Sequence, residues 1–291
     1  MTKKNMANLK EIRNRISSIS STMQITSAMK MVSAAKLKKA QDAITAMRPY
    51  SDKLTELLQG LSASLEGDGG SEYADKRSVN KVLVVAITSN RGLCGGFNSN
   101  IVKQSNSLVS NTYPGKQVDF YTIGKKGHDI LRKKHTILGD QSKVYDDLTF
   151  DNVAEIAELL MRLFTKGDYD KIELVYNKFK NAATQIVMTE QFLPIVGAEG
   201  DEAIAADYIF EPSKEEIVKE LIPKSLKTQL FKAIRDSFAS EHGARMTAMH
   251  KATDNAAELR DELKLTYNKA RQAAITNEIL EIVGGAEALN N

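Results

Sequence analysis

The sequence contains few of the residues that build chemical sites or anchor a chain in a membrane. Among its 291 residues there is one cysteine, Cys94, which excludes an internal disulfide and a metal site made of several cysteines. No apolar run approaches the roughly 20 residues that a membrane-spanning helix needs. Residues 1–16 lack the apolar stretch of a signal peptide, so we expect cytoplasmic synthesis and residence. The four histidines are scattered, as is typical of solvated or packed side chains: His128, His135, His242 and His250.

The net charge of +3 is distributed unevenly along the chain. Residues 1–41 contain nine Lys or Arg and a single acid, Glu11, whereas residues 241–291 contain six bases and eight acids. The basic segment is either a solvated helix face or a surface for an acidic partner. Nucleic acid is disfavoured as that partner, because residues 1–49 contain no aromatic side chain to stack on bases.

Two long helices are predicted, one near each end of the chain. Apolar residues recur every three or four positions from residue 8 to about residue 60, which is typical of an amphipathic helix or coiled coil. At 1.5 Å per residue this helix would be about 80 Å long, too long for a compact domain. We expect Pro49 to kink or interrupt it.

The second long helix is predicted from Ser213 to about residue 283. Ser213 and Glu216 form a capping-box pattern at its start, and the pair Gly284-Gly285 predicts its end. Side chains four residues apart share one face of a helix, so a row of alanines requires a partner helix to come unusually close. Such a row is present at Ala244, Ala248, Ala252 and Ala256.

The middle of the chain predicts an α/β module. Residues 66–78 are a polar, Gly-rich linker, and strands then alternate with helices, which indicates a mainly parallel sheet with helices on its faces. The expected strands are 81–89, 117–124, 171–179, 185–195 and 207–212, and the expected helices are 98–109, 125–134 and 151–166, the last with Asp151 as N-cap.

The fold class is therefore α/β, with a long antiparallel α-helical coiled coil formed by the N- and C-terminal helices and a central α/β domain. The expected segments are 1–65 for the first helix, 66–212 for the α/β domain and 213–291 for the last helix. An antiparallel pair would place both chain ends far from the α/β domain. A shaft of this kind is typical of a protein that partners grip rather than of an enzyme.

A glycine-rich turn from Ser89 to Gly96 is the strongest enzyme-like signal. Such a turn can hold phosphate on backbone N–H groups, but the glycine spacing is not that of a dinucleotide fingerprint and no Gly-Lys-Ser/Thr is present. A tight structural turn is favoured. No histidine lies near Cys94 in sequence, so a packed thiol is favoured over a nucleophile.

Three polar residues interrupt the apolar pattern near the end of the last helix: Arg271, Gln272 and Thr276. Arg271 offers a planar fork of donors suited to a carboxylate. On spacing alone, an ordinary solvated helix face is the favoured interpretation.

The chain resembles the gamma subunit of rotary ATP synthases in several stretches. The matching segments are ITSAMKMVSAAKL (25–37), NRGLCGGFN (90–98), ARMTAMHKATDNA (244–256), YNKARQA (267–273) and ITNEILEIVGGA (275–286). The resemblance covers essentially the whole chain in order. It implies an antiparallel coiled coil inside a ring of three alpha and three beta subunits, with a Rossmann-like domain at its foot.

The resemblance also implies a central-stalk rotor that couples proton-driven c-ring rotation to ATP synthesis or hydrolysis on beta. No catalytic residue, cofactor or metal is then expected on this chain. The implied partners are the alpha and beta subunits, with one copy of the chain in the ring, the epsilon subunit and the c-ring, and no nucleic acid. The implied location is the cytoplasmic face of the bacterial inner membrane, as a peripheral membrane protein.

The residues that the resemblance implies at partner contacts fall into two sets. Those matched to beta contacts are Arg271, Gln272, Thr276, Met29 and Lys30, the last two near an acidic lever of beta. Those matched to the foot on the c-ring loops are Tyr208, Phe210 and Glu211, while the apolar tip from Ile279 to Leu289 would turn in a collar at the top of the ring.

Four residues depart from the family pattern: Asn90 in place of the more usual Asp, and His242, Gly243 and His250. Two other function classes stay open from the residues alone. One is a nucleotide- or NAD-binding enzyme built on the α/β domain, and the other is a coiled-coil scaffold without rotary function.

Overall fold

The computed structural model describes residues 2–63, 72–74, 77–195 and 214–289. The chain forms two compact units. The first, called here the helical unit, consists of the residues up to Val32 and those from Met246 onward. The second, called the globular unit, consists of Ser33–Arg245. Each long helix contributes residues to both units, so these units do not coincide with the three expected segments, whose boundaries stay a prediction.

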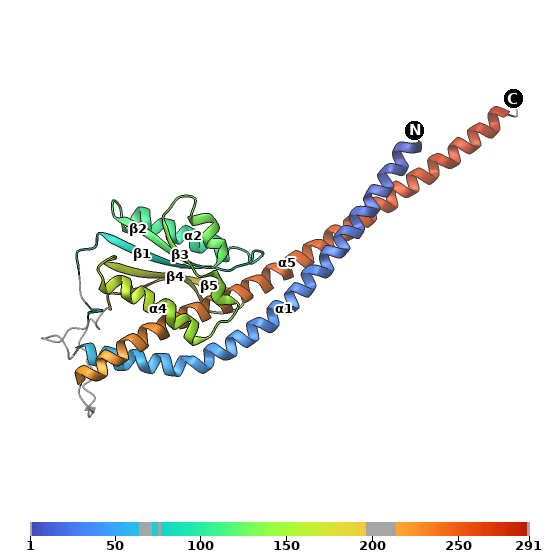
Figure 1. Cartoon of the computed structure of the whole chain (residues 1–291). Coiled ribbons are helices and arrows are strands. Elements are labelled where there is room, and N and C mark those ends of the chain that lie inside the picture. The colour runs from blue at the N-terminus through green and yellow to red at the C-terminus, as the bar shows by residue number, and fades with distance from the viewer. Residues whose placement is uncertain (1, 64–71, 75–76, 196–213, 290–291) are drawn as a thin grey trace. The chain divides into compact units, whose positions relative to one another are not determined.

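Two long helices are present as expected: α1 (Thr2–Ala63) and α5 (Lys214–Leu289) (Figure 1). Of the expected kink or interruption at Pro49, the interruption was wrong, because α1 continues through it, and the kink stays a prediction. Pro49 removes one intrahelical hydrogen bond, but it is exposed, so the carbonyl left without a partner can be solvated. The expected end at Gly284-Gly285 was also wrong, because α5 continues to Leu289. Glycine weakens a helix interior by only about 1 kcal/mol and does not by itself end a helix.

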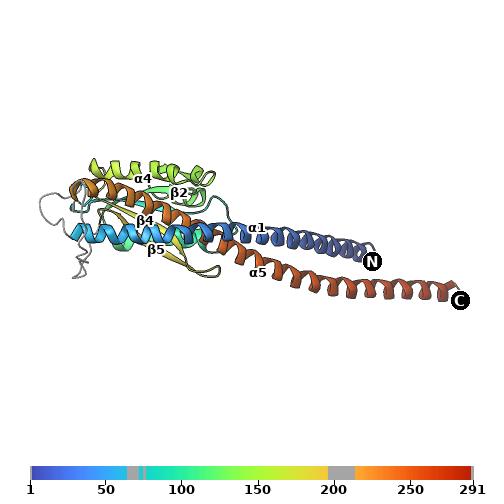
Figure 2. The same cartoon turned by 90° about the horizontal axis from the view of Figure 1, so that it is seen from below.

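In the helical unit, α1 and α5 run antiparallel. Four side-chain contacts join them: Arg13 with Tyr267, Met23 with Arg260, Thr26 with Thr253, and Lys30 with His250. The position in α1 rises from 13 to 30 while the position in α5 falls from 267 to 250, which only an antiparallel pair allows. Figures 1 and 2 show both chain ends at the same end of this unit.

The alanine row of α5 is divided between the two units. Ala248, Ala252 and Ala256 lie in the helical unit and are partly buried. Ala244 lies in the globular unit, where it packs with Cys94 and Phe97. The row therefore does not serve a single partner helix.

The globular unit contains a five-stranded sheet in the order β3-β2-β1-β4-β5, in which only β5 is antiparallel to its neighbour. The α/β class and the mainly parallel sheet are confirmed. The short strand β3, at one edge of the sheet, was missed. The strands are β1 (Lys81–Ile87), β2 (Gln117–Ile123), β3 (Ile137–Asp140), β4 (Lys171–Phe179) and β5 (Gln185–Leu193). The helices of the module are α2 (Phe97–Ser107), a π-helical turn (Leu108–Thr112), α3 (Lys125–Leu131), a 3-10 turn (Ser142–Tyr145) and α4 (Phe150–Thr165).

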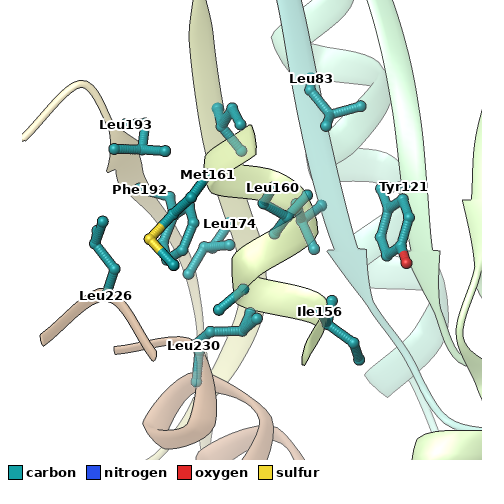
Figure 3. Close-up of a cluster of buried hydrophobic side chains, with 14 of the residues drawn as sticks. Leu83, Tyr121, Ile156, Leu160, Met161, Leu174, Phe192, Leu193, Leu226 and Leu230 are labelled. Atoms are coloured by element: carbon teal, nitrogen blue, oxygen red, sulfur yellow. The ribbon is translucent and has the colours of Figure 1, made fainter. Parts of the chain in front are cut away.

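The sheet is covered on both faces, and β1 shows how its sequence achieves this. All residues of β1 after Lys81 are buried, as a central parallel strand requires. Leu83, Val85 and Ile87 point into a cluster with α4 and α5, while the alternate residues pack with α2. Figure 3 shows the first cluster, to which α4 contributes Ile156, Leu160 and Met161 and α5 contributes Leu226 and Leu230.

The N-cap of α4 is Thr149 rather than the expected Asp151. The Thr149 hydroxyl accepts a hydrogen bond of 3.4 Å from the backbone N–H of Asn152. The helix begins at Phe150, one residue earlier than predicted, so Asp151 lies in the first turn, where its negative charge favours the helix dipole.

We expect Gly124→Ala to destabilise the globular unit severely. Gly124 has a φ of 113°, and an added Cβ would lie 2.1 Å from the carbonyl oxygen of Thr88. Since backbone at both positions would have to move, the free energy of unfolding in urea should fall by about 3 kcal/mol or more. Gly95→Ala is the matched control, because Gly95 also has a positive φ, of 58°, but nothing lies within 4 Å of an added Cβ. Equal losses for the two variants would contradict this account.

Candidate functional site

The carboxyl end of β1 is where an open α/β sheet would bind a ligand. The strand order reverses there, since β2 lies on one side of β1 and β4 on the other. The Gly-rich turn from Ser89 to Gly96 begins two residues after β1 ends, so the turn that the sequence singled out lies at this position.

The turn is occupied by a side chain of α5. The Arg245 guanidinium donates to the carbonyl oxygens of Arg91, at 3.1 Å, and Gly92, at 3.3 Å. It also donates to the Glu241 carboxylate at 2.6 Å, and both side chains of this ion pair are buried. The turn therefore presents carbonyl oxygens to a cation, the opposite polarity to a phosphate-binding loop, which agrees with a structural turn.

The turn is also held from within by its own side chains. Asn98 accepts a hydrogen bond from the Ser89 backbone N–H at 2.9 Å and donates to the Cys94 sulfur at 3.2 Å. The Cys94 side chain is 2% exposed, and burial raises the pKa of its thiol. Both observations describe a packed thiol rather than a nucleophile.

The hydrogen bonds of the Asn90 side chain explain why asparagine replaces the more usual aspartate at this position. Its amide nitrogen donates to the carbonyl oxygen of Ser142 at 2.8 Å, and its amide oxygen accepts from the backbone N–H of Lys125 at 3.0 Å. An aspartate could make the second contact but not the first, because an ionised carboxylate has no hydrogen to donate.

His242 and Gly243 lie on the buried face of α5 beside the Arg245–Glu241 pair. The His242 ring meets Phe238 edge-on, with ring centroids 4.6 Å apart. Burial, and then the nearby positive charges of Arg245 and Lys36, lower the pKa of His242 to about 4, whereas burial raises the pKa of Glu241. A Cβ on Gly243 would lie 3.2 Å from the Cα of Ala182, so glycine lets the β4–β5 connection approach α5 closely.

The structure brings three of the predicted contact residues together. Arg271, Gln272 and Thr276 lie exposed on neighbouring turns of α5. Met29 and Lys30 lie on α1 and are partly buried, with the Lys30 ammonium 3.3 Å from Nδ1 of His250. Because Lys30 pairs with His250, it lies about 30 Å along α5 from Arg271. Tyr208, Phe210 and Glu211 lie outside the described residues, as do the expected strand 207–212 and Ser213.

Neither a membrane span nor a metal centre is found in the parts of the chain that the structure describes. No described helix combines the length and the apolar character needed to cross a bilayer. The described His, Cys, Asp and Glu side chains form no group of three that could hold a metal ion.

Comparison with known proteins decides the family. A family model described as ATP synthase matches residues 8–289. The ATP synthase gamma chains of Flavobacterium psychrophilum and Flavobacterium johnsoniae are each 73% identical to this chain over 98% of its length, covering 99% and 100% of their own. The chain belongs to the ATP synthase gamma chain family. The resemblance expected from the sequence, and with it the role of a central-stalk subunit, is confirmed.

Solved structures agree with the fold. The central stalk/c-ring structure of the Tetrahymena thermophila mitochondrial ATP synthase contains a chain that matches with a TM-score of 0.59 and 25% identity, over 78% of this chain and 99% of that one. A chain of the Euglena gracilis mitochondrial ATP synthase matches with a TM-score of 0.72 and 22% identity, over 97% and 95%. At that identity, the second match supports the fold alone.

Sequence reasoning missed the buried Arg245–Glu241 pair. Its signal was the spacing, because a Glu four residues before an Arg lies on the same helix face. The same spacing occurs on many solvated helices, so the pattern does not reveal that this pair is buried.

We expect His242 to make stability depend on pH. Because the folded chain binds the His242 proton less tightly than the unfolded chain, the stability that neutral His242 contributes is present above about pH 6.5 and is lost as the pH falls toward 4. Between pH 7 and pH 5 this group alone should remove about 2 kcal/mol of unfolding free energy. The raised pKa of Glu241 acts in the opposite direction, so the measured quantity is the difference between wild type and His242→Gln.

The measurement is urea unfolding of both proteins at several pH values. The wild type should lose more stability than His242→Gln on going from pH 7 to pH 5, since Glu241 is present in both. Parallel pH profiles would contradict the assignment of a buried, neutral His242.

Proposed function

We propose that this chain is the rotating shaft that couples proton-driven c-ring rotation to ATP synthesis or hydrolysis on beta subunits. One copy would lie in a ring of three alpha and three beta subunits, with the epsilon subunit and the c-ring as further partners. The chain would carry no catalytic residue and would act as a peripheral membrane protein on the cytoplasmic face of the bacterial inner membrane. The antiparallel pair of α1 and α5, in a chain of this family, is the observation that carries the proposal.

The proposed mechanism is a shift of populations. A shaft whose side chains differ around its circumference makes different contacts with each of the three beta subunits. Each contact favours one conformation of a catalytic site by its differential interaction energy, and rotation changes which site is favoured. A shaft that interacted equally with all conformations of a catalytic site would not change their populations.

The residues proposed to carry these contacts lie at two levels of the helical unit. Arg271, Gln272 and Thr276 are exposed on α5, which makes them accessible to a beta loop. Met29 and Lys30 on α1 would meet an acidic segment of beta, in agreement with the excess of bases in residues 1–41. Contact of Tyr208, Phe210 and Glu211 with the c-ring is part of the same proposal, as is the division into segments 1–65, 66–212 and 213–291.

The structure argues against the alternative of a nucleotide- or NAD-binding enzyme. The crevice where such a ligand would bind contains the Arg245–Glu241 ion pair of the chain's own α5 helix. Arg245 is already bonded to the turn that would have to receive the phosphates. Nucleotide binding by the isolated chain at micromolar concentration would overturn this argument.

The experiment that tests the proposal is reconstitution with alpha and beta subunits from the same source. We expect a single assembly containing one copy of this chain, with a large gain in ATP turnover. A scaffold without rotary function would instead self-associate through its long helices and show no affinity for alpha and beta. Association without any change in turnover would also contradict the proposal.

Arg271→Ala should lower the ATP turnover of this assembly while leaving its formation largely intact. The substitution removes a charge-assisted contact worth about 1.5–3 kcal/mol, because a guanidinium fork bonds a partner's oxygen atoms directionally. The measurement is ATP turnover of the assembled complex. Lys269→Ala is the matched control, since it removes another exposed cation two residues away on α5. Unchanged turnover for Arg271→Ala, or equal losses for both variants, would count against a role for Arg271.

A further inference from the structure

Two different kinds of contact hold α5 in the globular unit. Leu226 and Leu230 pack in the apolar cluster beneath the sheet (Figure 3). Hydrogen bonds add to this packing along the helix, first from Gln229 and Arg235 and then, where the helix leaves the unit, from Ser240 and Arg245. Apolar packing is non-directional, whereas hydrogen bonds require defined distances and angles, so the polar contacts are the ones that fix the rotation of the helix about its own axis.

The last of these polar contacts, made by Ser240 and Arg245, join α5 to the carboxyl ends of two neighbouring strands. Beside β1, Arg245 donates to the carbonyl oxygens of Arg91 and Gly92. At β4, the Ser240 hydroxyl donates to the carbonyl oxygen of Asn177 at 3.0 Å. Arg245 is also the last residue of the globular unit. The contacts therefore hold α5 where it leaves that unit.

Arg245 is held in place by its ion pair with Glu241. The two side chains are 8% and 10% exposed, and the N···O distance is 2.6 Å. A buried guanidinium without a counter-charge would be strongly unfavourable, so Glu241 permits Arg245 to stay at the turn. The guanidinium is suited to this position because its fork reaches two carbonyl oxygens and a carboxylate at once.

The turn that Arg245 grips has an unusual conformation. Leu93 has a φ of 62°, in the left-handed region that a leucine seldom adopts, and its side chain is 66% exposed. Its own packing cannot account for this conformation. The neighbouring carbonyl groups of Arg91 and Gly92 are held by Arg245, and Cys94 on the other side is buried and bonded to Asn98.

We infer that Arg245 and Glu241 form a clamp that fixes the rotational setting of α5 on the sheet, so that torque passes between the globular unit and the rest of the helix. Arg245 is a positioning residue in this proposal, because it acts through the helix and touches no reactant. The consequence for coupling rests on the proposed rotor function. The clamp itself is a property of this chain alone and can be tested without partners.

Cys94 provides a direct reporter of the clamp. It is the only cysteine of the chain, and it lies within the turn that Arg245 contacts, where it is 2% exposed. In Arg245→Lys the charge is kept, but one ammonium group cannot bond both carbonyl groups and Glu241 in the same geometry. The rate at which 5,5′-dithiobis(2-nitrobenzoate) labels Cys94 in native buffer should therefore rise by about tenfold or more, as expected when a charge-assisted hydrogen bond is lost.

Arg235→Lys is the matched control. Arg235 also lies on α5 and donates to a backbone carbonyl, that of Leu148, at 3.0 Å, but it does not contact the turn of Cys94. Its substitution should leave Cys94 labelling at the wild-type rate. If Arg245→Lys fails to fold, as judged by circular dichroism, Glu241→Gln is the second variant, because it keeps the side-chain volume while removing the counter-charge. If a folded Arg245→Lys or Glu241→Gln protein is labelled at Cys94 at the wild-type rate, the proposal of a clamp is wrong.

The second readout is coupling in the full reconstituted complex, measured as protons pumped per ATP hydrolysed. The clamp variant should lower this ratio while Arg235→Lys retains it. Faster Cys94 labelling with an unchanged ratio would overturn the role in torque transfer. If the wild-type chain does not raise ATP turnover at all, the proposed rotor function fails, and the labelling experiment still decides whether the clamp exists.

Discussion

The antiparallel pairing of α1 with α5 is the constraint on which the rest of the structure depends. Helices of 62 and 76 residues expose more apolar surface than a helix can leave in water without a partner. Where the two helices pair, each covers part of the other, and contacts from Arg13–Tyr267 to Lys30–His250 set their register. This pairing places both chain ends at the same end of the helical unit and leaves side chains such as Arg271 exposed along α5.

The globular unit gives α5 an attachment that differs from ordinary core packing. A parallel sheet would normally use the carboxyl end of its strands for a ligand, yet here Arg245 and Glu241 fill that position. The cost of burying these charges is offset by their mutual contact and by the carbonyl groups they meet. The neutral His242 beside them adds no third charge to the cluster. A fold often used to bind small molecules here serves to hold a helix.

Periodicity made most of the architecture predictable. The three- and four-residue spacing of apolar positions gave both long helices, and buried runs such as residues 81–87 gave the parallel strands. Local signals failed where they are weak or ambiguous: β3 has only four residues, Thr149 competes with Asp151 as a cap, and Gly284-Gly285 does not stop α5. The residues predicted to contact other subunits were identified through the family resemblance and not from the pattern of residues. On spacing alone, Arg271 is typical of a solvated helix face.

The most direct test of the rotor account is to watch a single complex turn. A bead would be attached through Lys133→Cys, an exposed position after α3, in a complex whose alpha and beta subunits are fixed to a surface. Cys94 would not compete for the bead because it is buried. The account predicts rotation of the bead in one direction when ATP is added. Hydrolysis of ATP by the same complexes with a stationary bead would contradict it.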